Sequence, residues 1–210
     1  MPRIRFPRKS SLQYWPRKRA ASSIARIRNW PTIKEIKPAG FAGYKVGMTH
    51  GTITDLRPNS MTKGAELPVP LTIIECPPLK VIGIRCYKND AYGTHTSAQI
   101  LIDKQDKDVR RAIILPKKQT MTLEKLNADG CCDVRLLVAT QPGLTTIGAK
   151  KPAVFELGIG GAVAERLNYA KAKFGKEITV QEVFSEGNQI DTHAVTKGKG
   201  VQEHESKTFA

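Results

Sequence analysis

The chain has 210 residues with a hydrophobic content of 40% and a charged content of 25%, which suffices for one sizeable folded domain. Its longest stretch without charge, Leu136–Ala149, is too short and too interrupted for a membrane-spanning helix, and no apolar run near the start predicts a secretory signal. The formal net charge of +15 is unevenly placed: residues 1–50 carry twelve Lys or Arg and one acid, Glu35, and so hold +11 of it.

Residues 1–37 are predicted to form an extended basic arm. Four prolines interrupt this segment, and only one short helix, over Ala20–Arg28, is expected within it. The same prolines argue against an organellar transit peptide, which needs an amphipathic helix. The arm has too little apolar surface to fold alone, so we expect it to become ordered on a partner.

Aromatic side chains are interspersed among these cations, which predicts RNA as the partner. Lysine and arginine neutralise phosphates, and flat rings stack on unpaired bases. Thr196–Gly200 alternates lysine with glycine in a way that suits phosphate contact, although a flexible surface turn explains the pattern equally well. The candidate RNA-binding residues are Arg3, Arg5, Arg8, Lys9, Tyr14, Trp15, Arg17, Lys18, Arg19, Arg26, Arg28, Trp30, Lys45, Lys197 and Lys199.

A folded region is predicted to begin near Gly40 with a β-compatible segment over 41–48. Val69–Cys76 and Val81–Tyr87 read as two strands that pair with each other around Pro77-Pro78. Simple alternation along the second of these strands would place Ile82, Ile84 and Cys86 on one face and Arg85 and Tyr87 on the other. These features predict one wall of a half-buried sheet.

The second half of the chain mixes helix and strand patterns. Residues 103–130 are mixed in charge and tolerate helix, and a helix is predicted from about Gly161 to Lys173, where apolar residues recur at helical spacing. Many short strands separated by glycine and proline favour a β-barrel with α elements. The further predicted elements are strands over Val134–Thr140, Ala153–Leu157 and Ile190–Val195, and a short helix over Val180–Phe184.

The motif search gives no reason to expect catalysis. Gly158–Gly161 lacks the third glycine of a dinucleotide fingerprint, so it is interpreted as a strand-to-helix turn whose free amides could hold a phosphate. The four cysteines show no Cys-x-x-Cys spacing and are expected to be reduced thiols, and the four histidines form no constellation. We therefore expect no metal, no cofactor and no enzymatic activity.

Several long motifs resemble the archaeal and eukaryotic type of the large-subunit ribosomal protein L3 family. They are Ser11–Arg19, Gly40–His50, Leu71–Pro78, Lys150–Pro152, the helix after Gly161, and Val195–Gly200, and the match runs almost continuously from residue 1 to about Gln202.

This resemblance implies a structural rRNA-binding protein of the cytoplasmic ribosome. It implies a translation-protein-type β-barrel with an α-containing insertion and a basic arm, a role in early subunit assembly, and proximity to the peptidyl-transferase centre. Its partners would be large-subunit rRNA and neighbouring large-subunit proteins. The implied division is a basic arm over 1–37, first barrel strands over 38–102, an α/β insertion over 103–176, a return to the barrel over 177–200, and an atypical tail over 201–210.

The sequence departs from the family after Gly200. Members continue with a basic run and a long second half, whereas here Gln202 is followed by eight residues of net charge −1. The barrel is thus expected to be incomplete, and residues 38–200 to need a partner segment. A truncated or frameshifted gene and a family member split into two chains, one carrying the C-terminal half, both remain open.

Two rival functions differ in class from RNA binding. A peripheral membrane protein held by its basic arm is disfavoured because the prolines prevent a continuous amphipathic helix. A nucleotide-dependent enzyme built on Gly158–Gly161 is disfavoured by the failed glycine fingerprint. The prediction therefore includes no membrane partner.

Overall fold

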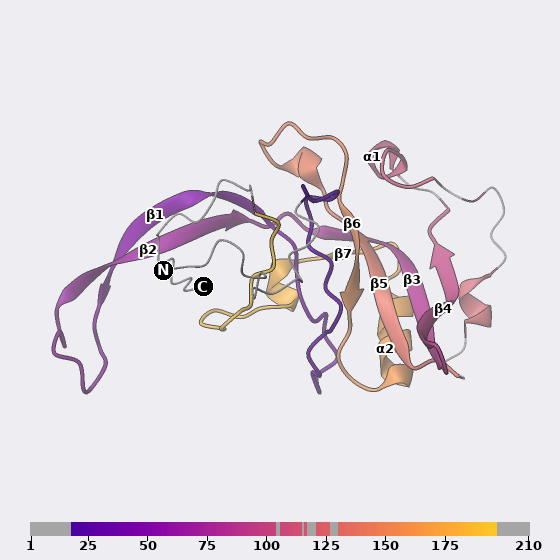
Figure 1. Cartoon of the computed structure of the whole chain (residues 1–210), viewed down its shortest axis with the longest axis horizontal. Helices are drawn as coiled ribbons and strands as arrows, with labels where there is room; N and C mark the ends of the chain where they lie inside the picture. The colour runs from indigo at the N-terminus through magenta and orange to yellow at the C-terminus, as the bar shows by residue number, and fades with distance from the viewer. Residues whose placement is uncertain (1–17, 104–105, 115, 117–120, 127–129, 197–210) are drawn as a thin grey trace, which may run out of the picture.

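The computed structural model describes residues 18–103, 106–114, 116, 121–126 and 130–196 (Figure 1). Its strands are β1 (Tyr44–Thr54), β2 (Glu66–Glu75), β3 (Leu79–Asp90), β4 (Gly93–Leu101), β5 (Asp133–Ala139), β6 (Val154–Gly158) and β7 (Glu177–Ile178). Its helices are α1 (Lys107–Arg110), α2 (Val163–Lys173) and the short 3-10 helices η2 (Leu123–Lys125), η3 (Pro142–Leu144) and η4 (Val180–Glu182).

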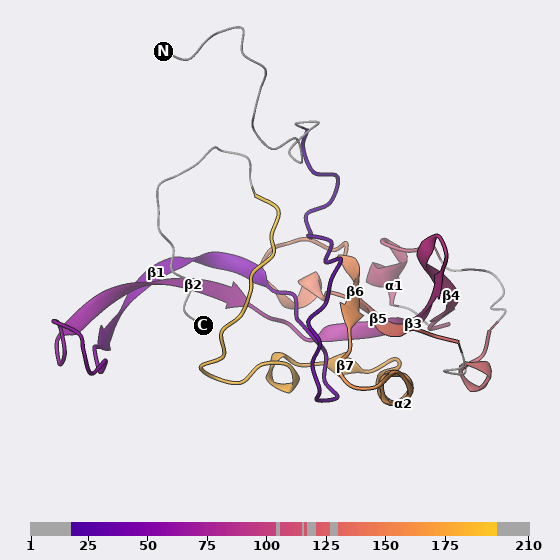
Figure 2. The same cartoon turned by 60° about the horizontal axis from the view of Figure 1, so that its bottom comes forward.

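The strands form two separate sheets. β1 and β2 pair as an antiparallel ribbon, which stands away from the other strands in both views (Figures 1 and 2). The second sheet has the order β4-β3-β5-β6, with β7 paired to the start of β3. This arrangement confirms the predicted mixture of strands with few helices.

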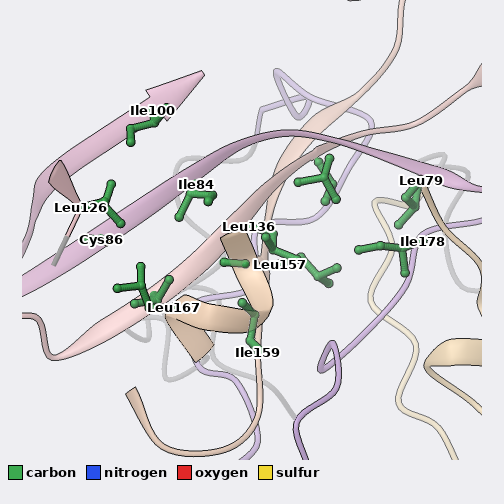
Figure 3. Close-up of a cluster of buried hydrophobic side chains, with 14 of the residues drawn as sticks. Leu79, Ile84, Cys86, Ile100, Leu126, Leu136, Leu157, Ile159, Leu167 and Ile178 are labelled. Atoms are coloured by element: carbon green, nitrogen blue, oxygen red, sulfur yellow. The ribbon is translucent and has the colours of Figure 1, made fainter. Parts of the chain in front are cut away.

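The main core lies between the five-stranded sheet and α2. Leu136 of β5 and Leu157 of β6 are register partners, and both are buried in the same cluster as Leu167 of α2 (Figure 3). Ile178 of β7 extends the cluster beside Leu79 (Figure 3). In Figure 2, α2 runs along one side of the sheet and α1 lies on the other.

A bulge in β3 divides its apolar residues between the two faces. The pairing of β3 with β5 shifts by one residue between Val81 and Gly83. As a result, Ile84 belongs to the main core, whereas Ile82 packs in a second cluster with Leu137 and with Val109 of α1. The prediction that Ile82 and Ile84 share a face was therefore wrong, because alternation holds only while the ladder is unbroken.

The predicted pairing of the strands on either side of Pro77-Pro78 was also wrong. Both strands form, but β2 pairs with β1 and β3 pairs with β4 and β5. Proline fixes φ and also favours an extended conformation for the residue before it, so the chain continues onward there and does not fold back as a hairpin.

The other predicted elements had mixed outcomes. β5, β6 and α2 confirm the expected strands and the long helix, and η4 occupies the place of the expected short helix. Among the described residues no helix forms over Ala20–Arg28 and no strand over Ile190–Val195, so those two predictions were wrong. β4 was not predicted, because its sequence, GTHTSAQIL, is largely polar and becomes a strand by pairing with β3.

The far end of the ribbon is held together by one carboxylate. Asp55 is 4% exposed and accepts hydrogen bonds from Ser60 Oγ (2.6 Å), Thr62 Oγ1 (2.8 Å) and three nitrogens of Arg57. The Arg57 guanidinium, followed by the Ser60 hydroxyl, keeps the pKa of Asp55 well below its ordinary value of 3.8. The turn therefore keeps its ionised carboxylate in mildly acidic solution.

Asp55→Ala is expected to open this turn without unfolding the five-stranded sheet. The substitution leaves several donors without their acceptor. Amide exchange at Gly64, which donates to the Asp55 carbonyl, and at Ala65, which donates to the Thr62 carbonyl, should therefore speed up by about tenfold or more. Ser60→Ala, which removes one of the bonds, should have a smaller effect. Unchanged exchange in Asp55→Ala would show that the carboxylate does not hold the turn.

Candidate nucleic-acid interface

The inner end of the basic arm is hydrogen-bonded to the body of the protein. Ala39 donates its backbone N–H to the Gly158 carbonyl (2.9 Å), and Gly160 donates to the Lys37 carbonyl (2.9 Å). Gly161 donates to the Ile33 carbonyl (2.9 Å), and Pro38 forms an isolated bridge with Ile159. The arm thus runs beside the end of β6, as its path across the middle of Figure 1 shows.

Glycines allow this close approach. A Cβ at Gly160 would lie 2.2 Å from the Glu35 carbonyl oxygen, and a Cβ at Gly158 would lie 2.6 Å from the indole of Trp30. Trp30 also packs over Gly40 and against the main core. The glycines of the strand-to-helix turn therefore accommodate the arm.

The amides of this turn are not free for phosphate, which corrects the interpretation made from the sequence. Gly160 and Gly161 donate to arm carbonyls, and Ala162 donates its N–H to Glu165 Oε2 (3.1 Å). No local pattern indicates that the Gly160 and Gly161 amides are occupied, because the carbonyls that accept their bonds come from a segment more than 120 residues away.

The outer part of the described arm exposes its cations. Lys18, Arg19, Arg26 and Arg28 are all exposed, and within residues 18–103 and the other described ranges none of them forms an ion pair. Lys45 is exposed on β1, away from that segment. The remaining candidates lie outside the described residues: Arg3, Arg5, Arg8, Lys9, Tyr14, Trp15, Arg17, Lys197 and Lys199.

An arginine–carboxylate network on the body was missed by the sequence reasoning. Arg135 donates to Asp133 Oδ2 (Nε, 2.9 Å) and to Glu156 Oε2 (Nη1, 3.2 Å). Arg85 pairs with the other oxygen of Glu156, and Arg166 of α2 donates to Asp133 Oδ1 (Nη1, 2.8 Å). Alternation does put Arg85 on the polar face of β3, but nothing in the sequence shows which strands lie beside it.

Electrostatics keeps this network ionised. Burial of Glu156 raises its pKa, but the Tyr87 hydroxyl and the two guanidinium groups outweigh that effect, so the pKa lies below its ordinary value of 4.5. The Arg135 guanidinium also lies over the Tyr87 ring, 4.6 Å from its centroid. Both contacts fix the arginines in place on the sheet.

Metal-binding clusters and membrane-spanning helices are absent from the described part of the chain. No group of three or more His, Cys, Asp or Glu there could hold a metal ion. Within the same residues, no helix has the length and apolar content needed to cross a membrane. The four cysteines all lie within the described ranges and form no disulfide there.

Comparison with known proteins agrees with the sequence resemblance. A family described as "Ribosomal protein L3" matches residues 1–207. The chain is 49% identical over 200 residues to the "Large ribosomal subunit protein uL3" of Archaeoglobus fulgidus, an alignment that covers 93% of this chain and 60% of the relative. Proteins of the same name from Methanosphaera stadtmanae (45%, covering 96% and 62%) and Methanocaldococcus jannaschii (44%, covering 95% and 61%) are also similar. The chain thus spans about three-fifths of the length of these curated relatives, and it belongs to the ribosomal protein L3 family.

Proposed function

We propose that this chain is a structural, non-enzymatic constituent of the large ribosomal subunit that binds large-subunit rRNA directly. The observation that carries the proposal is the basic arm, whose inner end is hydrogen-bonded to the body while four of its cations, Lys18, Arg19, Arg26 and Arg28, are exposed and form no ion pair among the described residues. Unneutralised charge of one sign at this density repels itself unless a polyanion lies against it.

Binding works through phosphate neutralisation and shape. The arm delivers lysines and arginines to the RNA backbone, and its aromatic residues stack on unpaired bases. Anchoring the inner end at Gly158–Gly161 fixes the direction in which the arm leaves the body and lowers the entropy lost on binding. Family membership supports this assignment, because the relatives are named as large-subunit proteins.

The finer assignments are proposals that rest on the same basis. The chain would act in the cytoplasmic ribosome, contact neighbouring large-subunit proteins, support early assembly and contribute to the surroundings of the peptidyl-transferase centre. The exposed apolar side chains of the ribbon, Val46, Met48, Ile53 and Ile73, would be covered by strands that complete a translation-protein-type barrel. Those strands would come from the remainder of the family's length, on the same polypeptide or on a second chain.

The dependence of rRNA affinity on salt tests the proposal. If about 6–8 phosphates are neutralised, the slope of log K against log salt should be roughly −4 to −7. Replacing Lys18, Arg19, Arg26 and Arg28 with glutamine should make the slope shallower by about 3. A matched control replaces four exposed lysines outside the arm, Lys63, Lys88, Lys107 and Lys125, and should change it little. A slope near zero in the unmodified chain would contradict the proposal.

A further inference from the structure

A cavity of about 350 Å³ lies where the arm crosses the body. Arm residues 28–32 form one side of it, and Asp133 and Arg135 of β5, Gly158 and Ile159 at the end of β6, and Arg166 of α2 form the other. This volume is at the lower end of the range for ligand pockets, about 300–1,000 Å³. Four segments that are distant in the sequence therefore converge on one small site.

The charges lining the cavity favour an anion. Arg28, Arg135 and Arg166 face a single carboxylate, Asp133, and both oxygens of that carboxylate are already used by Arg135 and Arg166. The side chains of Arg135 and Arg166 are only 18% and 21% exposed, so their positions are fixed by packing. Arg28 is exposed and forms no ion pair within the described residues.

Hydrogen-bonding capacity points the same way. Each guanidinium offers five N–H donors. Arg135 and Arg166 each use Nε and Nη1 in hydrogen bonds, which leaves Nη2 of each without a partner among the described residues. Trp30 forms part of the wall, and its Nε1 is the buried side-chain polar atom that lacks a hydrogen-bond partner in the described chain. A site this rich in donors suits a ligand with several acceptor oxygens.

We propose that this cavity, lined by Arg28, Arg135 and Arg166, is a binding site for a backbone phosphate of rRNA at the junction of arm and body. The inference rests on the proposed function and deepens it, because it adds a contact made by the folded body. One guanidinium group can bind two phosphate oxygens at once. Of the three arginines, Arg135 and Arg166 are already held in place by Asp133. Such a contact would set the register of the arm on the RNA, as phosphate contacts do in general.

Arg28 is the residue to change, because it is free of structural partners in the described chain. Arg28→Gln is expected to weaken binding to large-subunit rRNA transcripts by about tenfold, and Arg28→Lys by nearly as much, since lysine keeps the charge but loses the fork. Arg26→Gln is the matched control: it removes the same charge two residues away, from a side chain that does not line the cavity, and should cost about threefold or less.

Each other outcome overturns the proposal in a recognisable way. Equal losses in Arg26→Gln and Arg28→Gln, or full rescue by Arg28→Lys, would remove the cavity from the binding site while leaving rRNA binding intact. If the unmodified chain shows no salt-dependent rRNA binding, the proposed function itself fails. In a chain that does not bind rRNA, inorganic phosphate could still change the fluorescence of Trp30, measured in a Trp15→Phe background. If Arg28→Gln abolished that change, the cavity would be a site for free phosphate, and the RNA assignment would be overturned.

Discussion

Gly160→Ala is expected to lower the free energy of unfolding by about 2–3 kcal/mol and to loosen the arm from the body. The new Cβ would lie 2.2 Å from the carbonyl oxygen of Glu35, a distance that real Cβ atoms do not adopt. The obstacle is backbone, so no side chain can rotate away. Either the arm moves off β6, which breaks the bonds at Lys37 and Ile33, or the strand-to-helix turn shifts and strains the core.

Two measurements on the full chain distinguish the loss of stability from the release of the arm. Urea unfolding gives the loss of stability, and emission of Trp30 in a Trp15→Phe background reports whether the indole leaves its place over Gly158. Gly143→Ala is the control, because a Cβ there meets nothing within 4 Å and the residue does not have a positive φ. If the two alanine variants are equally stable and emit alike, close backbone contact does not hold the arm.

Local patterns in the sequence predicted elements better than they predicted neighbours. The apolar runs of β5 and β6 and the helical spacing of α2 were sufficient to place those elements, because each pattern lies within a few residues. The partner of β2 depended on the turn over 55–65. The Asp55 carboxylate holds this turn, and its role as an acceptor becomes visible only in three dimensions. The strand expected over Ile190–Val195 failed for a related reason, since in the described chain no neighbouring strand pairs with it.

The same limit explains what was missed at the candidate interface. The arm was predicted from its charge, its prolines and its small apolar content, which are all properties of composition. The cavity beside it requires Arg135 and Arg166 to meet Arg28, and these residues are brought together by a sheet order and a helix position that no local pattern encodes. The glycines of 158–161 were a local sign of a close contact at this place. They did not show what makes the contact, because glycine is needed whether a phosphate or another segment of backbone comes close.

Glu156→Gln is expected to destabilise the chain by about 1–3 kcal/mol at neutral pH. Arg85 and Arg135 are register partners on neighbouring strands, and Glu156 is the anion that they share. Glutamine keeps the shape but leaves two like charges facing each other, which is unfavourable across strands. The expected loss of unfolding free energy is smaller than for a fully buried ion pair, because the side chains of Glu156 and Arg85 are each 25% exposed.

The pH dependence gives this prediction its sharpest test. The pKa of Glu156 is lower in the folded chain than its ordinary value of 4.5, so its ionised form contributes stability above that pH. The contribution should disappear as the pH falls through the lowered pKa, and the difference in unfolding free energy between the unmodified chain and Glu156→Gln should shrink over the same range. Glu186→Gln, at an exposed site, should show no such change. A difference that stays constant from neutral to acidic pH would mean that the charge of Glu156 does not organise the arginines, and that Arg135 is held beside the cavity by Asp133 and packing alone.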